Sequence, residues 1–467
     1  MNRKITAVIL SVCLLLSLSG CSFASFDTKN LMAPPKVNED QQAIQELLQG
    51  DRPDIAFVYP QSGEYRSAVT MVDFTGDGVK DAIGFYSSET GNSGGVEVQF
   101  LVKTDAGWES AATFQNSALQ VDRVCFGTPS KAGHNLILIG WGSTAGTTGR
   151  TAAANAYVYS PNGDITEYAL GPYAELTVTD FDGDGVHEVF TVDKFLPAEE
   201  EGDEPTPARA KLFSWSGGRM AELSSVDADN SMAGYSSAAF GKLTSSLSGV
   251  VLDGVKADGS MSTQIFTLED GELKNFPKDV NTEEYSNPFL RPSTAAILSR
   301  DINGDGLLEI PQVSLLPGLP AETMPDATRY RVNWCRFQPE SLSRVVLRTM
   351  MNPTENYWFR LPFSLNGKIT AYNDSSRRTV TYTELIENPD GEEGYLLGET
   401  LFSIRVFTRS AWESRGPTSG FELLAVQNDS VYGLQVLTKN ASLQRAVSQI
   451  KQDFKLLSES PYDQMYF

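Results

Sequence analysis

Three nine-residue loops with the same spacing of acids and glycines constrain the fold more than any other feature of this sequence. They read DFTGDGVKD at 73–81, DFDGDGVHE at 180–188 and DINGDGLLE at 301–309. Successive loops begin 107 and 121 residues apart, and short runs of alternating or β-branched residues surround each one. Such runs, bounded by turn signals, predict β-strands. Their recurrence predicts a fold built from repeated sheets.

Four strand-like runs accompany each loop, as in SAVTMVDF, DAIGFY, VEVQFLV and WESAATF around the first. A unit of four runs without an acidic loop also fits into each interval between loops. A four-stranded sheet repeated at about fifty residues is what a propeller blade requires. We therefore predict a mainly β fold: a β-propeller of about five four-stranded blades over 54–353, with six or seven left open, and a small α+β domain over 354–467.

The N-terminus has the features of an exported protein. Arg3 and Lys4 precede an apolar run that suits a signal peptide over 1–20 and is too short for a permanent membrane span. The following LSGC resembles a bacterial lipobox, which implies cleavage before Cys21 and attachment of a diacylglycerol to its sulfur. Residues 21–53 would then form a lipidated tether and a short amphipathic helix. The alternative is a secreted protein in which this cysteine is coincidental.

The composition makes nucleic acid an improbable partner. The chain has 59 acidic and 37 basic residues, for a net charge of −22, which would repel phosphate backbones. Cys125 and Cys335 are far apart in sequence, and no cysteine or histidine cluster has the spacing of a zinc site.

The acidic loops predict up to three calcium sites. Calcium takes six to eight oxygen ligands, and a D-x-[DN]-x-D-G loop supplies them from side chains and a backbone carbonyl. Thr75 stands where an acid or amide is usual, so the first site should be the weakest. The alternative is a set of solvated turns without an ion. The candidate ligands are Asp73, Thr75, Asp77, Val79 and Asp81; Asp180, Asp182, Asp184, Val186 and Glu188; and Asp301, Asn303, Asp305, Leu307 and Glu309.

These loops and their flanking runs resemble the FG-GAP or VCBS-type repeats of integrin-α-like β-propellers. The resemblance covers roughly 54–350 and implies that each loop joins the first two strands of a blade. Blades two and four depart from it, with GTPSKAGHN and TSSLSG in place of the acids. The family implies extracellular binding and adhesion, or scaffolding, and does not fix a ligand.

We therefore expect an extracytoplasmic, membrane-anchored lipoprotein that binds an unidentified envelope polymer or protein and is not an enzyme. Trp141 and Arg150, in or beside the glycine-rich run 140–149, could contribute to a ligand surface or simply pack the loop. Two alternatives remain open. One is a polysaccharide-acting hydrolase with carboxylates on one propeller face, and the other is a structural subunit of an envelope complex. A close pair of carboxylates in the central channel would favour the hydrolase.

Overall fold

The computed structural model describes residues 39–50, 55–88, 95–142, 152–198, 202–318, 326–339, 342–388, 394–415 and 418–457. The predicted signal peptide and the predicted lipidation site Cys21 lie outside these residues. Within them, no helix has the length and apolar character needed to cross a membrane.

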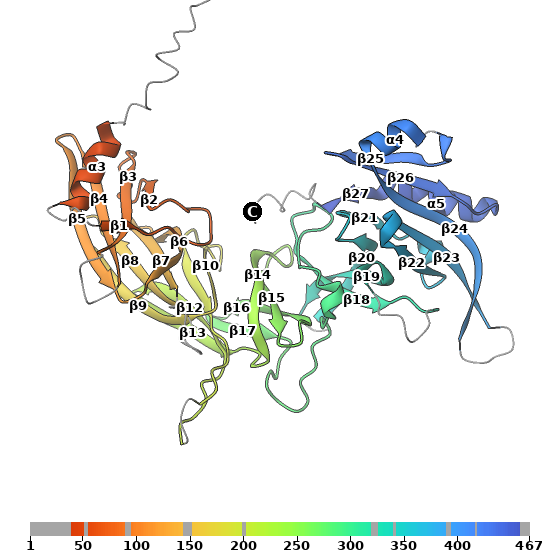
Figure 1. Ribbon diagram of the computed structural model, residues 1–467. Coiled ribbons are helices and arrows are strands. Elements are labelled where there is room, and N and C mark those ends of the chain that lie inside the picture. The colour runs from red at the N-terminus through yellow and green to blue at the C-terminus, as the bar shows by residue number, and fades with distance from the viewer. Residues whose placement is uncertain are drawn as a thin grey trace, which may run out of the picture.

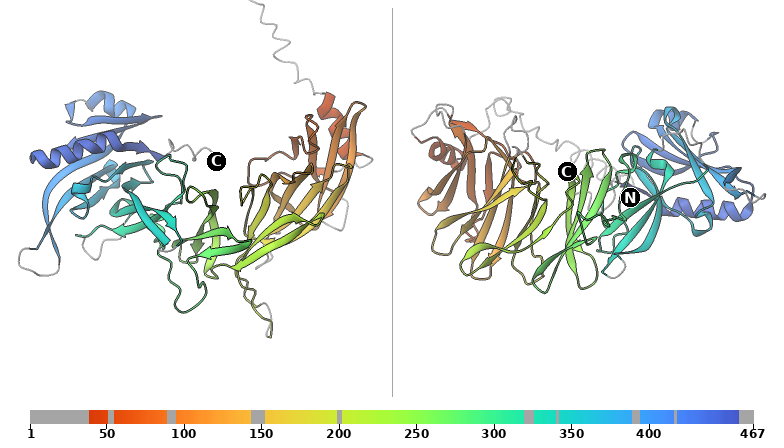
Figure 2. Two further views of the ribbon diagram at one scale, coloured as in Figure 1. Left: turned by 180° about the vertical axis from the view of Figure 1, so that it is seen from behind. Right: turned by 90° about the horizontal axis from the view of Figure 1, so that it is seen from below.

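The fold is mainly β, and the predicted fold class is confirmed. The described residues form six antiparallel sheets of four or five strands, which follow one another along the chain. Figure 1 shows them along an arc, with the first sheet at one end and the sixth at the other. The two further views in Figure 2 show the same separation of the two ends.

The first four sheets correspond to the first four predicted blades. In the first sheet both β1 and β2 pair with β3, and in the next three sheets the strands pair in sequence order. The strands are β1 (Ile55–Phe57), β2 (Val69–Val72), β3 (Asp81–Ser88), β4 (Val96–Thr104) and β5 (Gly107–Asn116); β6 (Gln120–Ser130), β7 (His134–Gly142), β8 (Ala152–Tyr159) and β9 (Ile165–Tyr173); β10 (Glu175–Thr179), β11 (Glu188–Val192), β12 (Arg209–Ser216) and β13 (Arg219–Asp227); and β14 (Met232–Lys242), β15 (Ser248–Lys256), β16 (Met261–Glu269) and β17 (Glu272–Phe276).

The fifth and sixth sheets contain the remaining strands. The fifth consists of β18 (Glu309–Leu315), β19 (Tyr330–Gln338), β20 (Leu342–Asn352), β21 (Tyr357–Arg360) and β27 (Phe454–Leu456). The sixth consists of β22 (Ile369–Asp374), β23 (Thr379–Glu387), β24 (Tyr395–Thr408), β25 (Glu422–Gln427) and β26 (Ser430–Val436). The α-helices among the described residues are α3 (Glu39–Gln49), α4 (Arg409–Arg415) and α5 (Ala441–Asp453).

Neighbouring sheets are held together by the alternation of side chains along their strands. In β3, Ile83 and Phe85 belong to the core shared with the second sheet, where Phe85 meets Trp141 edge to face. The residues on either side of them, Ala82 and Tyr86, belong to a separate cluster on the opposite face. Each sheet therefore needs an apolar cover on both faces.

Helix α3 covers the free face of the first sheet. Ile44 and Leu48 are buried in the cluster with Ala82 and Tyr86. A Cβ added at Gly84 would lie 2.5 Å from a methyl group of Leu48, so the glycine allows the helix to approach closely. The amphipathic helix predicted within 21–53 thus occupies the place that a preceding blade would take, at the start of the arc (Figure 1).

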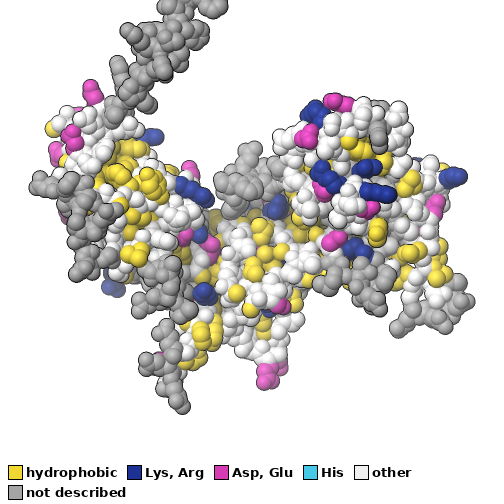
Figure 3. Space-filling view, in the orientation of Figure 1, with side chains coloured by type: hydrophobic (Ala, Val, Ile, Leu, Met, Phe, Trp, Pro, Cys, Tyr) yellow, Lys and Arg dark blue, Asp and Glu magenta, His cyan; other side chains and the backbone are white. Residues whose placement is uncertain are grey.

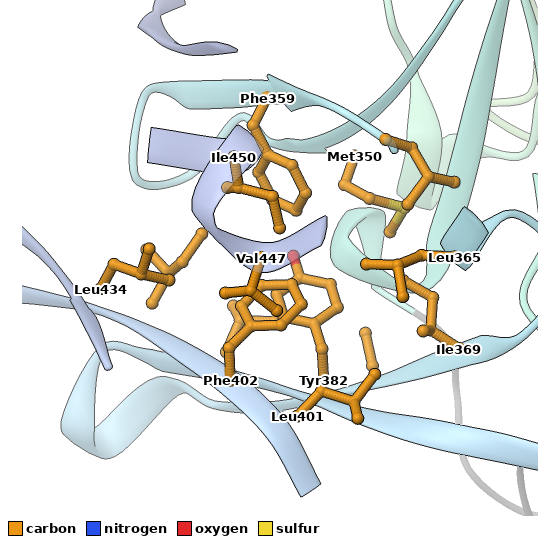
Figure 4. Close-up of a cluster of buried hydrophobic side chains, with 14 of the residues drawn as sticks. Met350, Phe359, Leu365, Ile369, Tyr382, Leu401, Phe402, Leu434, Val447 and Ile450 are labelled. Atoms are coloured by element: carbon orange, nitrogen blue, oxygen red, sulfur yellow. The ribbon is translucent and has the colours of Figure 1, made fainter. Parts of the chain in front are cut away.

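The C-terminal segment contributes to both the fifth and the sixth sheets. Its strands β21 and β27 complete the fifth sheet, so the predicted boundary at 353/354 falls between two strands of one sheet. Helix α5 ends at Asp453, because the chain then pairs as β27. Val447 and Ile450 of α5 pack onto Tyr382 and Phe402 of the sixth sheet in the largest core cluster (Figure 4).

Candidate metal loops and an inner-strand cavity

All three acidic loops have the same backbone framework. In each, the first aspartate accepts N–H hydrogen bonds from two glycines of the loop; in the second loop these run from Gly183 and Gly185 to Asp180 at 2.8 and 3.0 Å. These two glycines have φ of 80° and 89°, a region that a side chain would disfavour. The glycine spacing thus fixes the turn, whether or not an ion is bound.

The second loop gathers carboxylates into a possible metal site. It joins β10 to β11, and carboxylate oxygens of Asp180, Asp182 and Glu188 lie within 4.8 Å of one another. Burial, followed by the neighbouring acids, raises the pKa of Glu188 to about 7, although the Phe181 N–H opposes the shift. Asp184 is exposed and accepts the N–H of Val186 at 2.8 Å instead of joining the group. This cluster could hold a metal ion.

The third loop contains an arginine beside its acids. Arg336 of β19 donates from Nε to Glu309 at 3.1 Å and from Nη2 to Asp305. Asn303 turns its amide nitrogen toward Glu309, at 2.9 Å, and so presents a donor where a metal needs an oxygen. Burial raises the pKa of Glu309 to about 7, and Arg336 opposes this shift. Leu307 donates its N–H to Asp305 at 3.1 Å.

In the first loop the acids accept hydrogen bonds from backbone N–H groups. Asp81 is fully buried and accepts the N–H groups of Thr75 and Lys103 at 3.0 and 3.2 Å. Burial raises its pKa. Asp77 accepts the N–H of Val79 at 2.7 Å. Within the described parts of the chain, the second loop alone brings three acids together as a metal site would require.

The predicted ligand surface at Trp141 is absent. Trp141 lies within β7 and is 1% exposed, because the strand alternation directs it into the core between the first two sheets. The glycine-rich run begins as part of a strand, and this corrects the expectation that Trp141 belongs to a surface loop. Arg150 lies outside the described residues.

A cavity of about 460 Å³ lies where the first strands of the second, third and fourth sheets come together. Small residues on its walls, such as Gly142, Ala174 and Gly234, leave the space open. Polar and charged side chains also line it, namely Gln61, Gln120, Asp122, Arg123, Tyr173, Glu175 and Lys194.

Two carboxylates from neighbouring sheets meet at one arginine in this cavity. Arg123 donates from Nε to Asp122 at 3.1 Å and from Nη1 to Glu175 at 2.5 Å. The exposed side-chain fractions of Asp122 and Glu175 are 24% and 13%, so both acids can be reached from the cavity. Ser62 and Tyr173 also donate to Asp122, at 2.8 and 2.6 Å.

This pair was missed in the sequence because the two acids are distant from each other and belong to no motif. Asp122 lies near the start of β6 and Glu175 is the first residue of β10. Because both strands are the first of their sheets, the repeat itself places the two residues near one another. An acid at the same position in two successive units is therefore the signal that could have found them.

No family model matches the chain, and no curated protein matches it. The resemblance to FG-GAP or VCBS repeats therefore stays a prediction. Solved structures do resemble it. The exo-β-1,3-galactanase from Phanerochaete chrysosporium, solved with galactose, is 9% identical, with 82% of this chain and 88% of that chain covered and a TM-score of 0.27. A second structure of that enzyme, with β-1,3-galactotriose, is 10% identical, with 76% and 79% covered and a TM-score of 0.27.

A further solved structure is the exotype rhamnogalacturonan lyase YesX, which is 13% identical, with 73% of this chain and 75% of that chain covered and a TM-score of 0.27. At such identities a likeness concerns the fold alone. These neighbours are enzymes, whereas we expected a protein that is not one. That expectation is withdrawn.

Proposed function

We propose that the protein hydrolyses a polysaccharide of the cell envelope in the inner-strand cavity, with Asp122 and Glu175 as the reacting carboxylates. The proposal depends on the meeting of these two side chains in a cavity open to solvent. Glycoside hydrolysis needs two carboxyl groups at the scissile bond. One protonates the leaving oxygen, and the other activates water or attacks the sugar.

The hydrogen bonds suggest a role for each acid. Asp122 is oriented by Ser62, Tyr173 and Arg123, which suits a base or nucleophile that must keep one position. Burial, followed by the charge of Asp122, raises the pKa of Tyr173, so its hydroxyl remains a donor.

Glu175 would then take the remaining role, at the leaving oxygen. It accepts hydrogen bonds at Oε1, from Arg123 Nη1 and from the N–H of Leu176 at 3.1 Å. Its Oε2 accepts no hydrogen bond from the described residues and is the oxygen left to face a substrate. Arg123 lies between the two acids and keeps both oriented toward the cavity.

The test is the release of reducing ends from a panel of envelope polysaccharides. Asp122→Asn and Glu175→Gln should each lower the rate by roughly 10²- to 10⁴-fold, the range typical of a lost acid–base group. Glu355→Gln is the matched control, because Glu355 also binds an arginine, Arg378, but lies outside the cavity. Failure of every polymer to be cleaved, or full activity in both variants, would refute the proposal.

A calcium ion in the loop 180–188 would support this site. Strand β10 connects Glu175 directly to that loop, so an ion bound by Asp180, Asp182 and Glu188 would hold the strand that positions Glu175. Carboxylates in such a loop suit a hard cation. Calcium should raise both the unfolding temperature and the activity, and EDTA should lower them. An unchanged unfolding temperature would count against the ion.

We also propose that a lipid on Cys21 anchors the protein at the outer side of a membrane, as the lipobox resemblance implies. The 17 residues from Ser22 to Asn38 would then form the tether to α3. An anchored hydrolase would meet an envelope polymer at short range, where even weak binding suffices.

A further inference from the structure

Two arginines lie next to each other on one face of the fifth sheet, where it meets the sixth. Arg331 of β19 pairs with Met350, and Arg348 of β20 pairs with Asn333. Arg331 and Arg348 are therefore diagonal cross-strand neighbours, about 7–8 Å apart at Cα and within reach of each other's long side chains. Met350, on the same face, packs into the core shared with the sixth sheet.

Neither arginine has a balancing carboxylate. Among the described residues neither forms an ion pair. Arg331 donates from Nη1 to Asn366 at 2.9 Å, while its buried Nε has no hydrogen-bond partner. Burial, followed by the like charge of Arg348, lowers the pKa of Arg331. Two neighbouring positive charges with an unpaired buried donor are unfavourable unless an anion binds there.

Arg329, just before β19, adds to the excess of donors. It is 3% exposed, and its Nε and Nη2 have no partners. The nearby Asp326 acts on its charge, but the carboxylate of Asp326 is bound to Thr328 and Asn373. Around these three arginines and Asp326, positive charge thus exceeds negative charge. Figure 3 shows Lys and Arg side chains, with Asp and Glu side chains among them, over this end of the molecule.

We propose that Arg331 and Arg348 form a binding site for a doubly charged tetrahedral oxyanion, of the phosphate or sulfate class. Guanidinium groups bind such anions through paired N–H donors. The net charge of −22 does not prevent this, because charges farther away than about 8 Å are largely screened at physiological salt.

The test is calorimetric titration of the purified protein with inorganic phosphate, then sulfate, at constant ionic strength. Arg331→Gln and Arg348→Gln should each weaken binding by roughly tenfold or more, and Arg331→Lys should weaken it less. Arg209→Gln, which removes an exposed arginine paired with Asp227 in the third sheet, should have no effect. Wild-type affinity in both Arg331→Gln and Arg348→Gln would overturn the proposal. The absence of binding to the wild type at millimolar phosphate would also overturn it.

A second measurement covers the case in which a variant does not fold. A wild-type crystal soaked in selenate should give an anomalous peak between the two guanidinium groups, and a map without one would overturn the site. Flotation of the Cys21→Ser protein with phosphatidylglycerol vesicles then identifies the source of the anion. Vesicle binding that phosphate competes away indicates a lipid phosphate, and its absence indicates a free or polymer-bound one.

Discussion

Replacing Arg336 by Met should turn the loop 301–309 from an arginine-balanced turn into a calcium site. Arg336 is the cation that contacts both Asp305 and Glu309. Its removal leaves Asp305 and Glu309 without their cation, and a dication bound with the help of Asp301 would replace it. Asn303 would also be free to turn its amide oxygen toward the dication, because its partner Glu309 would then bind the ion.

The cost of this substitution follows from the exposure of the two partners. Glu309 is 0% exposed and Arg336 is 29% exposed. Breaking a fully buried pair costs about 3–5 kcal/mol, and an exposed pair contributes about 0–1 kcal/mol. For this mixed case we expect the free energy of unfolding to fall by about 2 kcal/mol in EDTA. Calcium at a hundredfold excess over its Kd would restore about 2.7 kcal/mol.

The assay is denaturant unfolding with and without calcium, together with the calcium stoichiometry from calorimetric titration. The wild type should bind one ion, in the loop 180–188, and Arg336→Met should bind one more. Arg344→Met is the matched control, since Arg344 is the exposed cross-strand partner of Arg336 and binds neither acid. A wild type that already fills the loop 301–309, or a variant that calcium does not rescue, would refute the reasoning.

Three further predictions concern pH, the N-terminal helix and the anchor. In EDTA the free energy of unfolding should fall as pH rises from about 4.5 to about 7, because folded Glu188 and Glu309 hold protons that the unfolded chain has released. Calcium should remove the part of this slope that Glu188 contributes. Denaturant melts at several pH values measure the slope, and a free energy that rises over this range would contradict the prediction. Gly84→Val should displace Leu48, expose the first sheet and so lower the unfolding temperature. Amide hydrogen exchange in α3 should become faster. Unchanged exchange would count against α3 as the cover of the first sheet. Cys21→Ser should release the protein from membranes, and its retention in the membrane fraction would exclude the lipid anchor.

The repeated sheets could be predicted from the sequence because both signals are local. The alternation in SAVTMVDF and NLILIGW directs every second side chain to one face, and the glycine positions of the loops force the same turn three times. The partners of these loops are not local. Arg336 reaches Glu309 only because β18 and β19 pair in that register, and the sequence does not state which residue will be opposite.

The cavity was also beyond sequence reasoning. Asp122 and Glu175 come together because successive sheets place their first strands side by side, and no short motif contains both residues. For Trp141, sequence reasoning proposed a functional role that the structure does not support. A tryptophan beside a glycine-rich run suggested an exposed loop, but one more residue of strand placed it in the core.

The most direct test of the central claim is a crystal structure of the Glu175→Gln protein with an oligosaccharide of the polymer that the wild type cleaves. The account predicts a sugar in the inner-strand cavity, with its glycosidic oxygen between Asp122 and the substituted side chain. A cleaved polymer whose fragment binds elsewhere on the protein, with the cavity empty, would contradict it.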